Sequence, residues 1–239
     1  MKQVLDSFSR ALNDLRAPRV LAVMLIPPLA ALLVWGALAW AFADDWSRWV
    51  ADFIAHSTWL TWIGSSGLTG VFVWASGIAA MAVLLPIVLI TAILVTDLVA
   101  MPMVVPWVAG RRFPGLEARK GGTVTGSVFN ATGTIVVFIL LWIVTLPLWF
   151  TGIGALVLPP LLSAFLNQRL FRYDALAEHA SREEYRRILS RAGGRLYLLG
   201  LLLALVYYIP LVNLAAPVVS ALAFTHFCLA ELARLRQKA

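Results

Sequence analysis

Pro160-Leu-Leu-Ser163-Ala164 and Pro217-Val-Val-Ser220-Ala221 are two copies of one short pattern, P-x-x-S-A, 57 positions apart. Each copy comes after an apolar segment, an X-Pro-Leu sequence and a short tip of small or polar residues. The first tip follows Leu146-Pro147-Leu148 and holds Gly152 and Gly154; the second follows Ile209-Pro210-Leu211 and holds Asn213. Because helix, turn and helix recur in the same order, residues 134–231 are predicted to form two related helical hairpins.

The composition assigns the chain to the membrane. Of its 239 residues, 61% are hydrophobic and 13% are charged, with a mean hydropathy of +0.87. A soluble domain carries about a quarter charged residues, so this chain cannot coat a water-soluble surface of its size. The apolar runs are continuous rather than alternating, which excludes a transmembrane β-barrel. The sequence therefore predicts an all-α integral membrane protein.

Several kinds of chemistry find no support in the sequence. The single cysteine, Cys228, excludes an internal disulfide and a cysteine metal cluster, and no cofactor is expected. The formal charge of +7 includes no basic run longer than two residues, so it indicates orientation in a membrane rather than nucleic-acid binding. His226 and Asp97 are the ionisable residues inside apolar segments, tyrosines aside, and neither H-E-x-x-H nor G-x-S-x-G occurs. We expect no catalytic or metal-binding residue, and hence no enzyme.

Residues 1–239 are interpreted as one membrane domain. Apolar residues at helical spacing predict an interfacial amphipathic helix over 1–19. Two long spanning helices are predicted at 20–42 and 71–101, followed by a loop. Between the two spans, Trp46, Trp49, Val50 and Phe53 share one helical face, which predicts a second interfacial helix at the opposite membrane surface.

The two hairpins are predicted at 129–170 and 196–231, joined by a cytoplasmic helix within 171–195. Ser181 and Glu184 form a capping box at the start of that helix, and Gly193-Gly194 is expected to end it. The apolar segments 134–146 and 196–209 are shorter than the roughly 20 residues of a full span, which favours re-entrant, half-penetrating hairpins. An arrangement with six spans stays open.

The distribution of Lys and Arg predicts the orientation. Residues 1–19 carry four, 43–70 one, 101–128 four, 169–195 seven and 231–239 three. Because basic segments stay in the cytoplasm, both termini and the last two long loops are predicted to be cytoplasmic in a multi-pass protein.

A family resemblance emerges from this order of elements. The kinked Pro27-Pro28 span, the second span ending in Ala100-Met-Pro102 and the sequence Ile209-Pro-Leu-Val-Asn213-Leu214 resemble the bacterial CysZ-type sulfate permeases and the wider etoposide-induced-protein family. The resemblance implies an inner-membrane location, two long spans with paired half-penetrating hairpins, homo-oligomers, and uptake of sulfate.

The resemblance is uneven at polar positions. The permease's pair of arginines at the start of the first span falls on Leu21 and Ala22, and its Pro-Phe-Asn stretch becomes Pro102-Met103-Val104. The glutamate that follows falls near Ala109. The fold is thus better supported than the sulfate activity.

The candidate substrate-binding residues lie at the hairpin tips, where helix N-termini after Pro160 and Pro217 direct N–H groups and dipoles at an anion. They are Thr151, Gly152, Gly154, Ser163, Asn213 and Ser220, with Asp97 in the second span. No Lys or Arg occurs in 130–167 or 197–231, so the alternative that these residues only shape turns is kept.

Two functions follow from these features. One is a permease for a small inorganic anion, and the other is a non-transporting membrane protein that organises lipid or partner proteins. We also expect Asn213→Leu to be more damaging than His226→Ala, because His226 lies within a regular helix.

Overall fold

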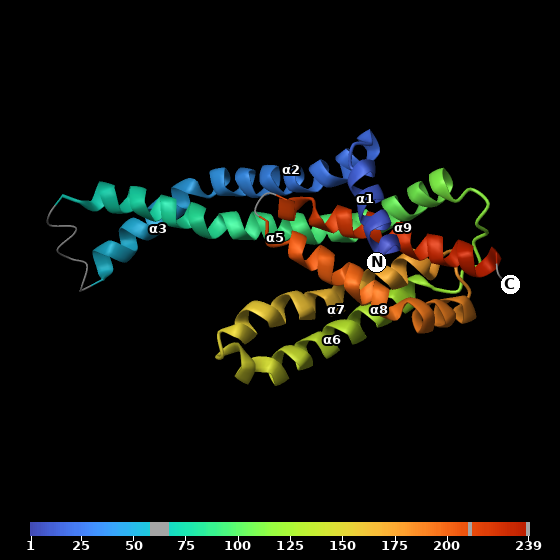
Figure 1. Ribbon diagram of the computed structural model, residues 1–239. Helices are drawn as coiled ribbons and strands as arrows, with labels where there is room; N and C mark the ends of the chain where they lie inside the picture. The colour runs from blue at the N-terminus through green and yellow to red at the C-terminus, as the bar shows by residue number, and fades with distance from the viewer. Residues whose placement is uncertain (58–66, 210–211, 238–239) are drawn as a thin grey trace. The chain divides into compact units, whose positions relative to one another are not determined.

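The computed structural model describes residues 1–57, 67–209 and 212–237, and these contain helices and no strand (Figure 1). The helices are α1 (Lys2–Asp14), α2 (Pro18–Ala41), α3 (Ala43–His56), α5 (Thr69–Arg112), α6 (Val124–Trp149), α7 (Ile153–Ala177), α8 (Arg182–Val206), the 3-10 helix η1 (Val212–Leu214) and α9 (Ala216–Gln237). The side chains of Ile54, Thr69, Ala79, Val83, Asp97 and Val124 lie outside the description. The chain divides into two compact units. Unit 1 is Met1–Met24 with Thr96–Ala239, and unit 2 is Leu25–Val95.

Unit 2 is a pair of apolar helices with a small contact between them. Ala31 of α2 packs with Val88 and Ala92 of α5, and the indole Nε1–H of Trp35 donates to Thr91 Oγ1 at 3.2 Å. Most large apolar side chains of this unit are exposed, among them Leu33, Trp40 and Trp74. Apolar side chains facing outward on a helix are typical of a surface that contacts lipid rather than water.

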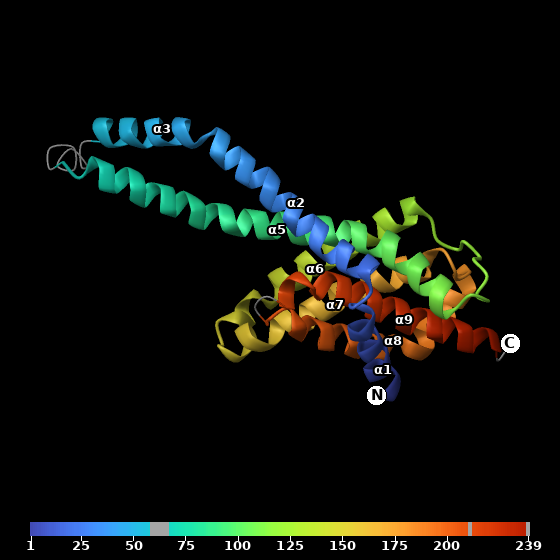
Figure 2. The same cartoon turned by 90° about the horizontal axis from the view of Figure 1, so that it is seen from above.

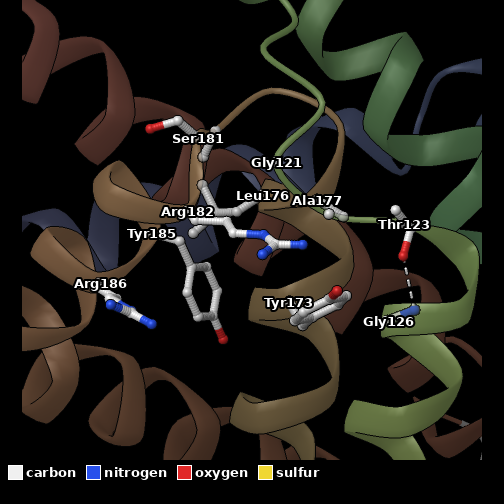
Figure 3. Close-up of a pocket in the computed structure, with 12 residues that line it drawn as sticks. Gly121, Thr123, Gly126, Tyr173, Leu176, Ala177, Ser181, Arg182, Tyr185 and Arg186 are labelled. Atoms are coloured by element: carbon white, nitrogen blue, oxygen red, sulfur yellow. Dashed lines mark hydrogen bonds between the residues drawn. The ribbon is translucent and has the colours of Figure 1, made fainter.

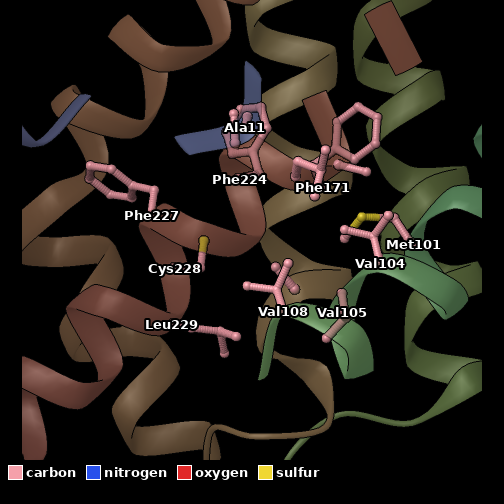
Figure 4. Packing of buried hydrophobic residues seen from close by; sticks show 14 of the residues in the cluster. Ala11, Met101, Val104, Val105, Val108, Phe171, Phe224, Phe227, Cys228 and Leu229 are labelled. Carbon is pink, nitrogen blue, oxygen red and sulfur yellow. The ribbon is translucent and has the colours of Figure 1, made fainter. Parts of the chain in front are cut away.

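Unit 1 is built around α9. Fifteen residues of this helix are buried, from Ala216 to Leu232, so it is covered on nearly every side. The stacked rings of Phe224 in α9 and Phe171 in α7 lie 5.7 Å apart at the centre of the cluster (Figure 4). Other buried members come from α1, α2, α5, α7 and α8, including Ala11, Val104 and Leu199. A helix with so little polar surface is buried either in a membrane or, as here, in protein.

The two hairpins of unit 1 lie with their tips at the same end of the unit (Figures 1 and 2). Helices α6 and α7 form the first hairpin, and α8 and α9, joined through η1, form the second. At the first tip Gly152 has a φ of +70°, a conformation that residues with a Cβ rarely adopt. The order of helix, tip and helix predicted from the repeat is therefore confirmed for both segments.

Two predicted helix ends are wrong. Helix α8 does not end at Gly193-Gly194 but continues to Val206, so 171–195 is no separate helix. Packing overrides the weak helix propensity of glycine there, since α8 buries Ala192 and Leu196 on either side of the pair. Helix α5 runs past the expected end at 101 to Arg112, because its last turns bury Val104, Val105 and Val108 in the core.

The length argument for re-entrant hairpins fails with these boundaries. Helices α6 and α8 are 26 and 25 residues long rather than 13 and 14. Six helices, α2 and α5 to α9, are long and apolar enough to cross a membrane. They differ in burial: 83% of the most apolar window of α9 is buried, against 6% for α6. Helix α6 therefore offers an apolar surface to lipid, whereas α9 is covered by protein.

The buried and exposed faces of the amphipathic helices α1 and α3 agree only partly with the prediction from the sequence. In α3 the rings of Trp46, Trp49 and Phe53 follow one another at 5.3 and 5.7 Å, which confirms their common face. The sequence also places Trp59 and Trp62 between the two predicted spans, and these residues lie outside the described part of the chain. For α1 the helical spacing predicts Leu5 and Leu12 on the apolar face and Asp14 on the polar side, and this is wrong for all three. The buried face is Val4, Ser7, Ala11 and Asp14, packed in the core of unit 1, while Leu5 and Leu12 are exposed.

Gly200 tests the packing of α8 against α7. A Cβ at this position would lie 2.7 Å from the carbonyl oxygen of Ala164, the last residue of the first P-x-x-S-A copy. We predict that Gly200→Ala destabilises the protein by about 1–3 kcal/mol because the two helices must move apart. Gly193→Ala, in the same helix but with open space around it, should be neutral or stabilising by about 0.5–1 kcal/mol. Thermal unfolding in detergent measures both, and equal effects of the two substitutions would contradict the close contact.

Candidate functional site

The groups at the first hairpin tip are used by the turn itself. The Thr151 hydroxyl donates to the carbonyl oxygen of Leu148 at 2.7 Å and accepts from the N–H of Gly154 at 3.0 Å. A Cβ on Gly154 would overlap the Leu148 carbonyl, so this glycine is needed for the tight turn. Thr151, Gly152 and Gly154 therefore have a structural role here, whatever else they do.

The second hairpin leaves polar atoms without partners. Ser220 in α9 is fully buried, and its hydroxyl oxygen has no hydrogen-bond partner among the described residues. The side-chain oxygen of Asn213, in η1, is also buried and unpartnered in that part of the chain. Ser163 lies half-buried in α7, and Asp97 lies on α5 with its side chain outside the described residues. In the described chain no hydrogen bond joins the predicted residues of one hairpin to those of the other.

A buried network of three polar side chains lies elsewhere in unit 1, at residues that the sequence did not single out as a binding site. His226 Nε2–H donates to Asp14 Oδ2 at 2.7 Å, and Arg112 Nη2 donates to Asp14 Oδ1 at 2.9 Å. The side chains of His226 and Asp14 are 0% and 7% exposed, and that of Arg112 is 36% exposed. The carboxylate of Asp14 thus joins the end of α1 to the end of α5 and the middle of α9.

The contacts of His226 show which of its ring nitrogens carries the hydrogen. The other ring nitrogen of His226, Nδ1, is buried with no partner among the described residues, so a proton there would have no acceptor. The neutral imidazole therefore carries its hydrogen on Nε2, toward Asp14. The sequence held one signal for this contact, because Asp14 continues the spacing of Val4, Ser7 and Ala11 on the buried face of α1.

A second polar cluster holds the loop before α6 against the α7–α8 connection. Backbone N–H groups of residues 119–122 donate to the carbonyl oxygens of His179, Glu178, Ala180 and Ala177, at 2.8 to 3.3 Å. Gly121 and Gly122 permit this approach, since a Cβ on either would overlap residues 177–182. Burial lowers the pKa of His179, and the nearby Arg236 acts in the same direction, against the opposing effect of Glu178.

Glu184 is the centre of that cluster. It forms the predicted capping box with Ser181, which is confirmed, and it also accepts from Arg119 at 2.8 Å and from Arg236 at 2.9 Å. Arg236 further donates to the backbone carbonyls of Glu117 and His179. These bonds fix the end of α9 to the start of α8.

A pocket of about 320 Å³ lies beside this cluster, where α6 and α8 begin (Figure 3). Figure 3 shows Arg182 extending between Tyr185 of α8 and Tyr173 of α7, with Thr123 and Gly126 of the α6 start on the other side. Arg186 also lines the pocket. Thr123 caps α6, its hydroxyl accepting from the N–H of Gly126 at 3.0 Å. In the described parts of the chain, no three His, Cys, Asp or Glu side chains lie close enough to hold a metal ion.

Residues 7–217 match the family described as sulfate transporter CysZ/etoposide-induced protein 2.4. The chain belongs to this family. With the apolar helices of the fold, membership makes it a multi-pass membrane protein in contact with lipid. Comparisons with curated proteins and with solved structures returned no match.

Within the family, this chain places its charges differently from the pattern that the resemblance implies. The resemblance implies an arginine pair at Leu21 and Ala22, which carry no charge, and a glutamate near Ala109, which is a buried apolar residue. Among the described residues, the buried carboxylate of Asp14 is instead paired with Arg112 and hydrogen-bonded to His226.

The structure reverses the expected order of damage for Asn213 and His226. We predict that His226→Leu destabilises the protein by about 1–3 kcal/mol, because it leaves an oxygen of the buried Asp14 carboxylate without its donor. Asn213→Leu should cost less, since its buried oxygen has no bond to lose. Denaturation in detergent compares the two.

A double-mutant cycle shows whether the effect of His226 acts through Asp14. Adding Asp14→Leu to His226→Leu should destabilise by less than the sum of the single changes, with a coupling of about 0.5–3 kcal/mol. His56→Leu, at an exposed position in α3, is the control and should stay within about 0.5 kcal/mol of the wild type. Strict additivity would show that the two residues do not interact.

Proposed function

We propose that the protein is an anion permease of the sulfate-transporting type. The observation that carries this proposal is the family match over residues 7–217, which includes every apolar helix except most of α9. We place the protein in a bacterial inner membrane with both termini in the cytoplasm, as the distribution of Lys and Arg indicates. The proposal includes a homo-oligomer, which the family resemblance implies, and assigns no catalytic step to the chain.

The substrate contacts are proposed at the second hairpin. Dehydrating even a singly charged carboxylate-sized ion costs on the order of 20 kcal/mol in the idealised limit, while a helix terminus contributes at most about 2 kcal/mol. An anion therefore needs several donors with spare capacity. The buried Ser220 hydroxyl has no partner in the described chain, so it is free to turn its hydrogen toward an anion. The unpartnered side-chain oxygen of Asn213 can only accept, so an anion there would have to bind the amide NH2 group. Thr151, Gly152, Gly154, Ser163 and Asp97 remain weaker candidates.

The alternative function is a non-transporting membrane protein that organises lipid or partner proteins. Leu21, Ala22 and Ala109 favour it, because the family's charged residues are missing at these three positions. Uptake of radiolabelled sulfate into vesicles that contain the purified protein, compared with vesicles of lipid alone, separates the two functions. Uptake no faster than in lipid alone would rule out the sulfate permease.

Ser220→Ala tests the site within the same assay. We predict a loss of sulfate uptake of about tenfold, because a hydrogen bond to a charged group is worth about 1.5–3 kcal/mol. The midpoint of thermal unfolding should not fall, since the Ser220 hydroxyl has no partner to lose. Ser190→Ala, which removes an exposed hydroxyl that donates to the carbonyl oxygen of Arg187, is the matched control and should leave uptake unchanged. Unchanged uptake in Ser220→Ala would remove this residue from the site.

We also propose that both hairpins are re-entrant, on the positions of their polar residues rather than on helix length. In α7 the apolar stretch from the tip ends at Asn167, Gln168 and Arg169, and in α8 it begins after Arg195. These stretches rise only about 21 Å and 17 Å at 1.5 Å per residue, against about 30 Å for a hydrocarbon core. A complete crossing would draw the arginines into hydrocarbon, which is costly.

Single cysteines at the tips distinguish the two topologies. In a Cys228→Ala background, Phe150→Cys and Val212→Cys should resist an impermeant maleimide added from the periplasmic side, while Ser57→Cys should react. Phe150 is 90% exposed in the protein, so resistance there would result from lipid and not from burial. Labelling of both tips at the rate of Ser57→Cys would instead favour six spans.

A further inference from the structure

The pocket at the starts of α6 and α8 contains positive charge that the protein does not neutralise. Elsewhere in unit 1 three arginines have carboxylate partners: Arg112 pairs with Asp14, Arg236 with Glu184, and Arg195 with Glu231. The half-buried Arg169 and Arg172 instead contact Phe165 and Gln168, and the two pocket arginines are exposed. Arg182 and Arg186, which line the pocket, have no hydrogen-bond or ion-pair partner among the described residues. The adjacent Glu183 lies within 3.9 Å of Arg187, and Glu184 is bonded to Arg119 and Arg236.

The neutral groups that line the pocket include hydroxyl groups, which can donate hydrogen bonds to an oxyanion. Thr123 and Gly126, at the start of α6, line the pocket, and the Thr123 hydroxyl accepts from the N–H of Gly126. Tyr173 and Tyr185 pack edge to face with centroids 5.9 Å apart. The Tyr173 hydroxyl lies against the backbone of Gly126, where any Cβ would collide with it. The volume of about 320 Å³ is at the lower end of the range for small-molecule sites.

We propose that this pocket binds the phosphate group of an anionic phospholipid, with Arg182 and Arg186 as its cationic ligands. Free phosphate or sulfate offers the same oxyanion chemistry, but the surroundings favour a lipid. Directly after Gly126, α6 exposes Val128 and Phe129, which are 60% and 76% accessible, and the exposed apolar surface continues at Ile135 and Val136. A phospholipid with its phosphate in the pocket has an apolar surface for its acyl chains within the next turns of α6.

The position of the pocket is consistent with the headgroup level of a membrane. The charged residues of α7 follow Gln168 and those of α8 precede Leu196, so they occupy the ends of the two helices that adjoin the pocket, while the apolar stretches run from there toward the tips. Lys and Arg near a membrane surface attract anionic lipid through the cytoplasmic leaflet's negative charge. The site thus goes beyond the proposed transport function, because it concerns a lipid and not the transported ion.

Binding is measured by titrating the purified full-length protein in a neutral detergent with phosphatidylglycerol, and separately with phosphatidylcholine, sodium phosphate and sodium sulfate. Native mass spectrometry counts the bound lipid, and thermal shifts report the soluble ions. We expect saturable binding of phosphatidylglycerol at least tenfold tighter than that of phosphatidylcholine. Binding of sodium phosphate or sulfate as tight as that of phosphatidylglycerol would overturn the lipid assignment.

Substitutions inside and outside the pocket distinguish a specific lipid site from a general attraction of lipid to surface charge. Arg182→Gln with Arg186→Gln should weaken phosphatidylglycerol binding at least tenfold, and Tyr173→Phe should weaken it a few-fold. Arg187→Gln with Arg191→Gln removes the same charge from exposed positions of α8 outside the pocket and should leave binding within twofold of the wild type. Equal losses in both pairs, or no loss in the first, would refute the site.

A stability control keeps these outcomes interpretable. Arg182 and Arg186 have no partners in the described chain, so their replacement should leave the unfolding midpoint in neutral detergent unchanged. Sulfate uptake into vesicles of phosphatidylcholine alone measures the transport function without the anionic lipid. Lipid binding and sulfate uptake can therefore fail separately, and the loss of one leaves the other testable.

Discussion

The contact of His226 with Asp14 is the interaction on which unit 1 depends. Helix α9 is buried along most of its length, and an unpaired imidazole inside it would cost the desolvation of its polar nitrogen. The Asp14 carboxylate removes part of that cost, and Arg112 neutralises the carboxylate in turn. One polar chain thereby fixes α1 and the end of α5 against the central helix, and the surrounding apolar packing of Phe224, Ala11 and Val108 can close around it.

The exposed apolar surface of α6 follows from the central position of α9. Because α9 occupies the centre of unit 1, α6 is left with one side against α7 and the rest facing outward. Its contacts with α7 are polar at the base, where Ser127 donates to Asp174 and Asn130 donates to the carbonyl oxygen of Arg169. Toward the tip, Ile139, Leu140 and Ile143 are exposed, and lipid is the solvent that such a surface requires. The hairpin is thus joined by hydrogen bonds near its charged end and surrounded by hydrocarbon at the other.

Features that depend on neighbouring residues could be predicted from the sequence. The two hairpins, the capping box of Ser181 with Glu184 and the aromatic face of α3 depend on neighbours within a few residues, and all three were predicted. Prediction failed where tertiary contacts outweigh local preference. Gly193-Gly194 stays helical because the flanking turns are packed, and α5 continues past Pro102 because its last turns are buried. The Asp14–His226 pair joins residues 212 positions apart, and only the helical spacing of Asp14 with Ala11 hinted that its side chain faces the core.

The polar groups without partners differ between the tips of the two hairpins and their base. Near the tips the described chain holds neutral oxygens without partners, at Ser220 and Asn213, and no cation. At the base it holds the unpaired guanidinium groups of Arg182 and Arg186. A cation deep in hydrocarbon would hold an anion too firmly for release and would itself be costly to bury, whereas neutral donors bind weakly and at little cost. A permease with this distribution would hold its lipid with charge at the surface and pass its anion along neutral donors, which is why the charged pocket and the transport site are expected to be different places.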